Sequence, residues 1–129
     1  MGNPIDTVRR FCAAWSDNVS TAELVAFLTH DAVYHNIPLT PIAGREAIAD
    51  NIDSLIRPRA PGIEAIQMKI LHIAASDPIV MTERTDVFTL SGRSFELAVM
   101  GTFEVSKGKI KAWRDYSDSN QFVSRLGSG

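Results

Sequence analysis

The stretch IVMTERTDVFTLSGRSFELAVMGTFEVSKGKIKAWRDYS, residues 79–117, decides the fold of this chain. It holds three runs rich in β-branched and aromatic residues, at 79–90, 94–105 and 109–117, and each of the two short connections contains a glycine. Such runs with short glycine-containing connections are typical of β-hairpins. The stretch therefore predicts a three-stranded antiparallel meander.

A helix is expected ahead of these strands, over residues 4–16. Val8, Phe11, Cys12 and Trp15 fall at positions i, i+3, i+4 and i+7, which puts them on one side of a helix. We expect this side to face the core. Cys12 is then a core residue, because a free cysteine behaves as a small apolar side chain.

Two more helices are expected before residue 60. Residues 20–23 have the S-x-x-E form of a capping box, and the short helix that they open is expected to carry Leu24, Phe27 and Leu28. A third helix is expected from about residue 44 to 56, and two prolines follow it.

Further strands are expected at 32–38 and 63–74. Helices followed by a run of strands predict an α+β fold, in which helices cover one face of a mainly antiparallel sheet. A length of 129 residues suggests one domain over residues 1–129.

Composition excludes several functional classes. Hydrophobic residues make up 45% of the chain and charged residues 22%, which argues against disorder. The formal net charge is −2, so nucleic acid is not an expected partner, and one cysteine excludes a disulfide framework and a cysteine-based zinc site. No apolar run is long enough to span a membrane and no signal peptide is recognisable, so we expect a cytoplasmic protein.

Charged residues occur where a core is expected. On the strand 79–90, one face has Arg84 and Asp86 between apolar residues, while the opposite face mixes Glu83 with Met81 and Val87. The first face suggests an ion pair inside an apolar pocket. A solvated outer face with an incidental ion pair is the alternative.

Two other strands add polar residues that share a face. Tyr34 and Asn36 point to one side of the strand 32–38, and such a pair can hold a water molecule. A tyrosine at the sheet edge beside a turn-forming asparagine is the alternative. In Trp113-Arg114-Asp115-Tyr116, the tryptophan and the aspartate share a face. An aspartate between two aromatic residues is unusual for a merely solvated carboxylate.

The meander brings two of these carboxylates into range of each other. The strands of Asp86 and Asp115 flank the middle strand, so their backbones lie roughly 10 Å apart at ~4.8 Å per strand. This separation leaves room for a substrate and a water molecule between the carboxyl groups, as in the inverting hydrolysis of sugars. Arg84 is placed to reach both.

The three polar segments, residues 34–38, 82–87 and 113–116, resemble in order and spacing the signature of the limonene-1,2-epoxide hydrolases. The resemblance runs from about residue 4 to 122 and includes Pro-x-x-Gly-Arg at 41–45 and Gly-x-Phe at 101–103. It implies the cone-shaped α+β fold (NTF2-like or cystatin-like) of nuclear transport factor 2, ketosteroid isomerase and SnoaL-like polyketide cyclases. Its curved mixed sheet is mainly antiparallel and packs against N-terminal helices.

The resemblance also implies a role for each polar residue. Asp115 matches the general base, Tyr34 and Asn36 match the residues that hold the nucleophilic water, Asp86 matches the general acid, and Arg84 matches the arginine that bridges both carboxylates. The implied activity is the addition of water to a small hydrophobic epoxide, without a cofactor. The expected apolar pocket lining is Phe88, Leu97, Val99 and Phe122.

The resemblance also implies a homodimer, because members of this family pair through the exposed face of the sheet. The interface is expected to include outward positions such as Glu96, Met100, Thr102 and Arg114. Two alternatives stay open: an isomerase or polyketide-cyclase-like enzyme of the same fold, and a non-catalytic NTF2-like binding module.

The histidines and the remaining motifs give no other catalytic site. There is no G-x-S-x-G elbow, and the histidine spacing matches no metal motif. His35 should point away from Tyr34. His72 should lie on the side of Ile66, Met68 and Ile70 as a wall residue, and His30 should end a helix.

Overall fold

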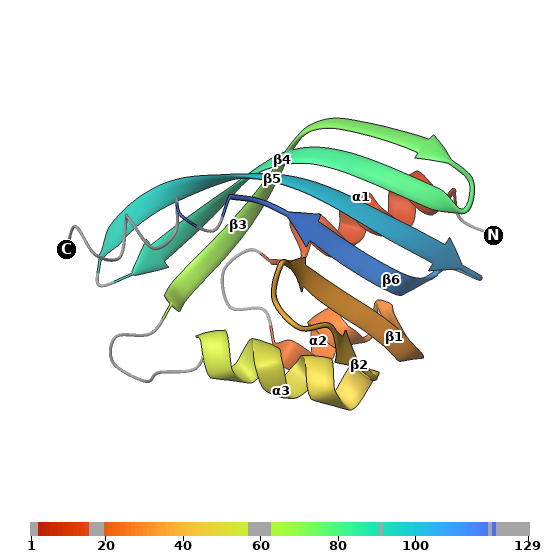
Figure 1. Ribbon diagram of the computed structural model, residues 1–129, viewed down its shortest axis with the longest axis horizontal. Helices are drawn as coiled ribbons and strands as arrows, with labels where there is room; N and C mark the ends of the chain where they lie inside the picture. Colours follow the sequence, from red (N-terminus) through yellow and green to blue (C-terminus); the bar gives the residue numbers. More distant parts are fainter. Residues whose placement is uncertain (1–2, 16–19, 57–62, 91, 119, 121–129) are drawn as a thin grey trace.

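The computed structural model describes residues 3–15, 20–56, 63–90, 92–118 and 120 (Figure 1). Its elements, in chain order, are α1 (Pro4–Ala13), α2 (Thr21–Val25), β1 (Leu28–Ile37), β2 (Ile42–Ala43), α3 (Arg45–Ile56), β3 (Ile63–Ser76), β4 (Ile79–Leu90), β5 (Arg93–Ser106) and β6 (Lys109–Tyr116).

In the described part of the chain, six strands form one sheet in the order β2-β1-β6-β5-β4-β3. All neighbouring strands are antiparallel except β1 and β6, which are parallel. The predicted meander is therefore confirmed as β4, β5 and β6. Figure 1 shows a strongly curved sheet with the helices on its inner side, and this is the expected α+β fold.

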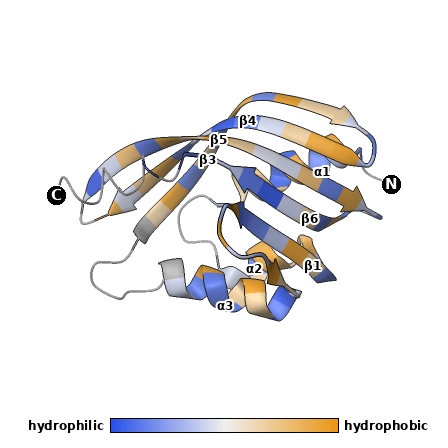
Figure 2. Cartoon of the chain, viewed as in Figure 1, coloured by the Kyte–Doolittle hydropathy of each residue, from blue (hydrophilic) through white to orange (hydrophobic). Residues whose placement is uncertain are grey.

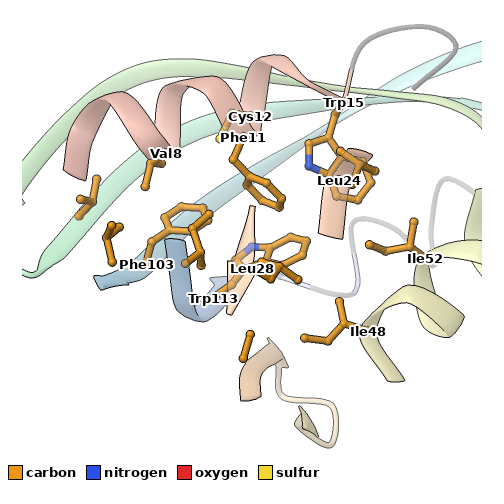
Figure 3. Packing of buried hydrophobic residues seen from close by; sticks show 14 of the residues in the cluster. Val8, Phe11, Cys12, Trp15, Leu24, Leu28, Ile48, Ile52, Phe103 and Trp113 are labelled. Atoms are coloured by element: carbon orange, nitrogen blue, oxygen red, sulfur yellow. The ribbon is translucent and has the colours of Figure 1, made fainter. Parts of the chain in front are cut away.

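The core lies between α1 and the inner face of the sheet. Val8, Phe11 and Cys12 of α1 are buried, which confirms the predicted apolar side of this helix. The ring of Phe11 lies edge-on to Trp113 of β6, with centroids 5.1 Å apart, and to Phe103 of β5 at 6.2 Å (Figure 3). These contacts fix α1 across the two strands whose inner faces continue into the polar site described below.

Local signals start the helices as expected. Asn3 accepts a hydrogen bond from the backbone of Ile5 and caps α1, with Pro4 at its first position. Ser20 and Glu23 form the predicted capping box of α2. The helix α1 ends at Ala13, earlier than predicted, although Trp15 is still buried in the core.

The predicted start of β1 at residue 32 was wrong, because the strand begins at Leu28. Leu28 was expected in the second helix, but it pairs with Ile110 of β6, whose backbone N–H donates to the carbonyl of Phe27 at 2.8 Å. Pairing with a distant strand thus outweighs the local helical pattern. His30 consequently lies exposed within β1 and not at a helix end.

The predicted position of His72 was also wrong. The register between β3 and β4 shifts between Ile70 and His72, and this bulge turns His72 to the outer face of the sheet. There its Nδ1 lies 2.9 Å from Glu83 Oε1, and its side chain is 83% exposed. A bulge inserts one residue into the alternation of a strand, so a strict two-residue period assigned His72 to the wrong face.

Candidate active site

The even-numbered residues of β4 form the inner face of that strand. Val80, Thr82, Arg84 and Asp86 are all buried, with exposed fractions of 4% or less, whereas Met81 on the opposite face is 53% exposed. Figure 2 shows that hydrophilic and hydrophobic residues both occur along the strands of the sheet. The ion-pair interpretation of this face is therefore confirmed, and the solvated alternative is wrong.

Arg84 binds Asp86 through two parallel hydrogen bonds. Nε donates to Oδ1 at 3.0 Å and Nη2 donates to Oδ2 at 2.9 Å. The arginine side chain is 0% exposed and the aspartate side chain is 5% exposed. A planar guanidinium fits a carboxylate in this forked geometry, which fixes the orientation of both groups.

The same guanidinium reaches Asp115 on β6. Nη1 donates to Asp115 Oδ1 at 3.1 Å, and Thr82 Oγ1 lies 3.4 Å from the same nitrogen. The strand β5 lies between β4 and β6. Its Gly101 pairs with Thr82 of β4 on one side and with Asp115 of β6 on the other. One buried cation therefore bridges two buried carboxylates across three strands, as the sequence suggested.

Tyr34 and Asn36 come to this cluster from β1. Because β1 and β6 are parallel, Tyr34 lies beside Trp113 and Asn36 lies beside Asp115 in the strand register. The ring of Tyr34 packs on Trp113, with centroids 4.0 Å apart and planes 32° apart. This contact holds the tyrosine on the same face as Asp115.

A cavity of about 370 Å³ opens onto this cluster. Tyr34, Asn36, Asp86 and Asp115 all contribute to its wall. The remaining lining is mainly apolar: Trp15, Ile37, Pro38, Leu39, Asn51, Ile52, Ile66, Met68, Phe88, Leu97, Val99, Trp113 and Ser117.

Three of the four expected apolar lining residues, Phe88, Leu97 and Val99, line this cavity. Phe122 lies outside the described residues. The wall residues contributed by α3 and by the turn after β1, such as Asn51 and Leu39, were not predicted. No local pattern marks them, because tertiary packing brings them to the cavity.

Burial is the largest single influence on the pKa values of Asp115, Arg84 and Tyr34. It raises the pKa of Asp115, while the charge and the hydrogen bond of Arg84 oppose this rise and the charge of Asp86 adds to it. Burial alone would lower the pKa of Arg84, but the hydrogen bond with Asp86 and both carboxylate charges outweigh it, so its pKa rises and it stays cationic. Burial also raises the pKa of Tyr34, and the negative charge of Asp115 raises it further.

Cys12 does not take part in the hydrogen bonds of Arg84. Cys12 is 2% exposed in the core, as predicted, and burial raises the pKa of its thiol to about 12. Among the described residues, no three His, Cys, Asp or Glu side chains gather so that they could hold a metal ion. Nor is any described helix long and apolar enough to cross a membrane.

Comparison with known proteins gives a consistent result. Residues 2–127 match the sequence profile of the limonene-1,2-epoxide hydrolase catalytic domain. Epoxide hydrolase EphG of Mycobacterium tuberculosis is 38% identical over 93 residues, which are 72% of this chain and 59% of EphG. The alignment thus spans less than two thirds of that relative's length.

Solved structures resemble the whole fold. An LEH-like epoxide hydrolase of M. tuberculosis has a TM-score of 0.81 and 30% identity, and the match covers 98% of this chain and 90% of that one. A SnoaL-like protein of Shewanella putrefaciens has a TM-score of 0.83 at 12% identity, and the match covers 100% of this chain and 99% of that one. The second likeness concerns the fold alone.

Proposed function

The chain belongs to the limonene-1,2-epoxide hydrolase family, and on that premise we propose that it adds water to a small hydrophobic epoxide to give a vicinal diol. The reaction runs in one step by general acid and base catalysis and uses no cofactor. One observation carries this proposal: Arg84 bridges Asp86 and Asp115 in the wall of a mainly apolar cavity.

Opening an epoxide with water needs two proton transfers. The attacking water must lose a proton, and the leaving epoxide oxygen must gain one. In this proposal Asp115 is the base and Asp86 is the acid. Tyr34 and Asn36 hold the water beside Asp115, because a phenol and an amide can each donate and accept hydrogen bonds.

Charge counting supports one shared proton. With both aspartates ionised, the cluster with Arg84 carries a net charge of −1 in a buried site, and a single proton makes it neutral. The raised pKa of Asp115 means that this carboxyl holds a proton to a higher pH than an ordinary aspartate. Ionised Asp115, the form that can act as base, therefore becomes populated only as the pH rises.

The two hydrogen bonds from Arg84 fix the orientation of the Asp86 carboxyl group. The reaction needs the shared proton on Asp86 and an ionised Asp115. In this proposal a water molecule held by Tyr34 and Asn36 donates a hydrogen bond to ionised Asp115, which favours that form of the base.

The cavity favours a small cyclic or terpene-like epoxide. Its volume lies at the lower end of the range for small-molecule sites. Phe88, Leu97 and Val99 give the wall apolar contacts, so an apolar ring can be positioned without leaving polar groups unpaired.

Diol formation from a panel of terpene, cyclohexene and styrene epoxides tests the function. The assay contains a metal chelator and no cofactor, and Asp86→Asn serves as a matched control of nearly equal volume. We expect diol from at least one cyclic epoxide with wild type and none above background with the variant. Isomerised or cyclised products would favour the isomerase or cyclase alternative, and binding without turnover would favour the binding-module alternative.

Two further expectations belong to this proposal. We propose a homodimer formed through the outer face of the sheet, where Met81, Met100 and Tyr116 are 44–53% exposed. A cytoplasmic location stays a prediction from the sequence.

A further inference from the structure

Gly101 lies in the middle of β5, between the strands that carry the two carboxylates. It pairs with Thr82 of β4 and with Asp115 of β6, and it faces the same side of the sheet as Arg84. Its φ lies outside the left-handed region, so a requirement of the backbone does not explain a glycine here. A glycine inside a strand weakens it and often marks a place where another group approaches closely.

The close approach at Gly101 is that of the arginine. A Cβ atom built on Gly101 would lie 2.3 Å from Arg84 Nη1, and 2.9 Å from both Asp115 Oδ1 and Thr82 Oγ1. Non-bonded heavy atoms normally separate by about 3.5 Å or more. A methyl group and the Nη1–Asp115 contact therefore cannot occupy this space together.

Arg84 has little freedom to give way while keeping its contacts. Its side chain is fully buried, and Nε and Nη2 are tied to Asp86. The weaker link is the single hydrogen bond from Nη1 to Asp115. A side chain at position 101 would thus separate Arg84 from Asp115 and leave the fork on Asp86 in place.

We propose that Gly101 is a positioning residue of the site, whose missing side chain provides the space in which Arg84 reaches Asp115. Its catalytic meaning rests on the proposed function. The geometric part concerns how the two carboxylates are coupled and holds whatever the substrate is.

A side chain at position 101 should therefore change the pKa of Asp115 selectively. In the described part of the chain, Tyr34 and Cys12 also interact with Asp115, besides Arg84 and Asp86, and burial raises the pKa of both. Arg84 is the cation that lowers the pKa of Asp115. Its withdrawal raises that pKa further, and each added unit reduces the ionised fraction tenfold at any pH below it.

The first test is Gly101→Ala, with Glu104→Ala on the opposite face of the same strand as a control. Carboxyl ¹³C NMR titrations of the folded proteins follow Asp86 and Asp115 separately. We expect the pKa of Asp115 to rise by at least one unit in Gly101→Ala and to stay unchanged in Glu104→Ala. An unchanged Asp115 titration in folded Gly101→Ala would overturn the proposal.

Thermal unfolding gives a second readout that needs no substrate. Alanine is a better strand residue than glycine, so without a clash Gly101→Ala should raise the melting temperature. We expect a lower one. In an Arg84→Lys background, Gly101→Ala should lower the melting temperature much less, because lysine has no atom at the position of Nη1. Equal effects in both backgrounds would contradict the proposal, even if Gly101→Ala alone is too unstable for NMR.

Activity provides the third readout. We expect the acid limb of the kcat/KM profile of Gly101→Ala to move to higher pH, with at least a tenfold loss below it, while Glu104→Ala matches wild type. If wild type hydrolyses no epoxide, the proposed function fails, yet the titration and unfolding results still decide the role of Gly101. An unmoved acid limb in an active Gly101→Ala protein would overturn the role.

Discussion

Replacing Arg84 by lysine separates the charge of this residue from its shape. The arginine donates three hydrogen bonds to carboxylates, two to Asp86 and one to Asp115, and it is 1% exposed. Lysine keeps the positive charge, but its single ammonium group cannot form a planar fork. It can align one carboxylate and must release the other.

The expected losses of folding free energy and of catalytic rate can be worked out from these contacts. A hydrogen bond to a charged group contributes about 1.5–3 kcal/mol, and lysine retains about one of the three. The loss of two such bonds should lower the free energy of unfolding by about 3–6 kcal/mol. We expect a value near the lower end, because lysine keeps the positive charge. For catalysis, a misplacement of about 1 Å costs ~100-fold. We therefore predict for Arg84→Lys a kcat/KM reduced by ~100-fold or more.

Steady-state diol formation, with folding checked by circular dichroism and thermal unfolding, measures both effects. Arg9→Lys is the matched control, because Arg9 is exposed on α1 and does not line the cavity. It should leave turnover and stability unchanged. Turnover near the wild-type level in a folded Arg84→Lys protein would show that catalysis does not require the bridge.

Three further predictions concern the carboxylates and the outer face. Asp86→Asn and Asp115→Asn should each lower kcat by about 10²–10⁴-fold or more without unfolding the protein, which a diol assay and circular dichroism can check. Because burial raises the pKa of Asp115 above its ordinary ~3.9, this carboxyl contributes stability that is fully present below pH ~4 and is lost as pH rises through its folded pKa. Asp115→Asn should remove that loss, so its melting temperature relative to wild type should increase with pH. The opposite trend would contradict the raised pKa. Sedimentation at micromolar concentration should find a dimer, and Met100→Asp should yield a monomer; a monomeric wild type would refute the pairing.

The sequence predicted the meander well because its turns and strands are marked locally. Gly92 and Gly108 adopt positive φ angles in the two connections, as short hairpins require. The observed bounds of β4 match the predicted ones at both ends. Once this meander is known, Asp86 and Asp115 are placed on the two neighbours of the middle strand. Strand spacing alone does not give their separation, because Asp115 pairs with Gly101 whereas Asp86 pairs with Leu97, further along β5.

Other features depend on contacts that no local pattern contains. Both faces of β4 mix polar with apolar residues, so its periodicity left the inner side undecided. The burial of Arg84 and Asp86 settles it, because these side chains lie on the inner face. The bulge that turns His72 outward leaves no mark in the residue pattern of β3. The early start of β1 reflects its parallel pairing with β6, about eighty residues away along the chain.

Gly101 illustrates the same limit within the site. The sequence shows a glycine in a strand, which can indicate a bulge, a bend or a close approach. Only the distances to Arg84 and Asp115 identify which of these applies.

A single-turnover experiment in ¹⁸O-labelled water, with enzyme in excess over epoxide, tests the central claim most directly. If Asp115 activates water while Asp86 protonates the oxirane, the incoming oxygen comes from the solvent and the diol carries the label after one turnover. If an aspartate were the nucleophile, its own carboxyl oxygen would enter the diol, because the ester is hydrolysed at its carbonyl carbon. We predict a labelled diol. An unlabelled diol, with the label retained on Asp86 or Asp115, would contradict the one-step mechanism.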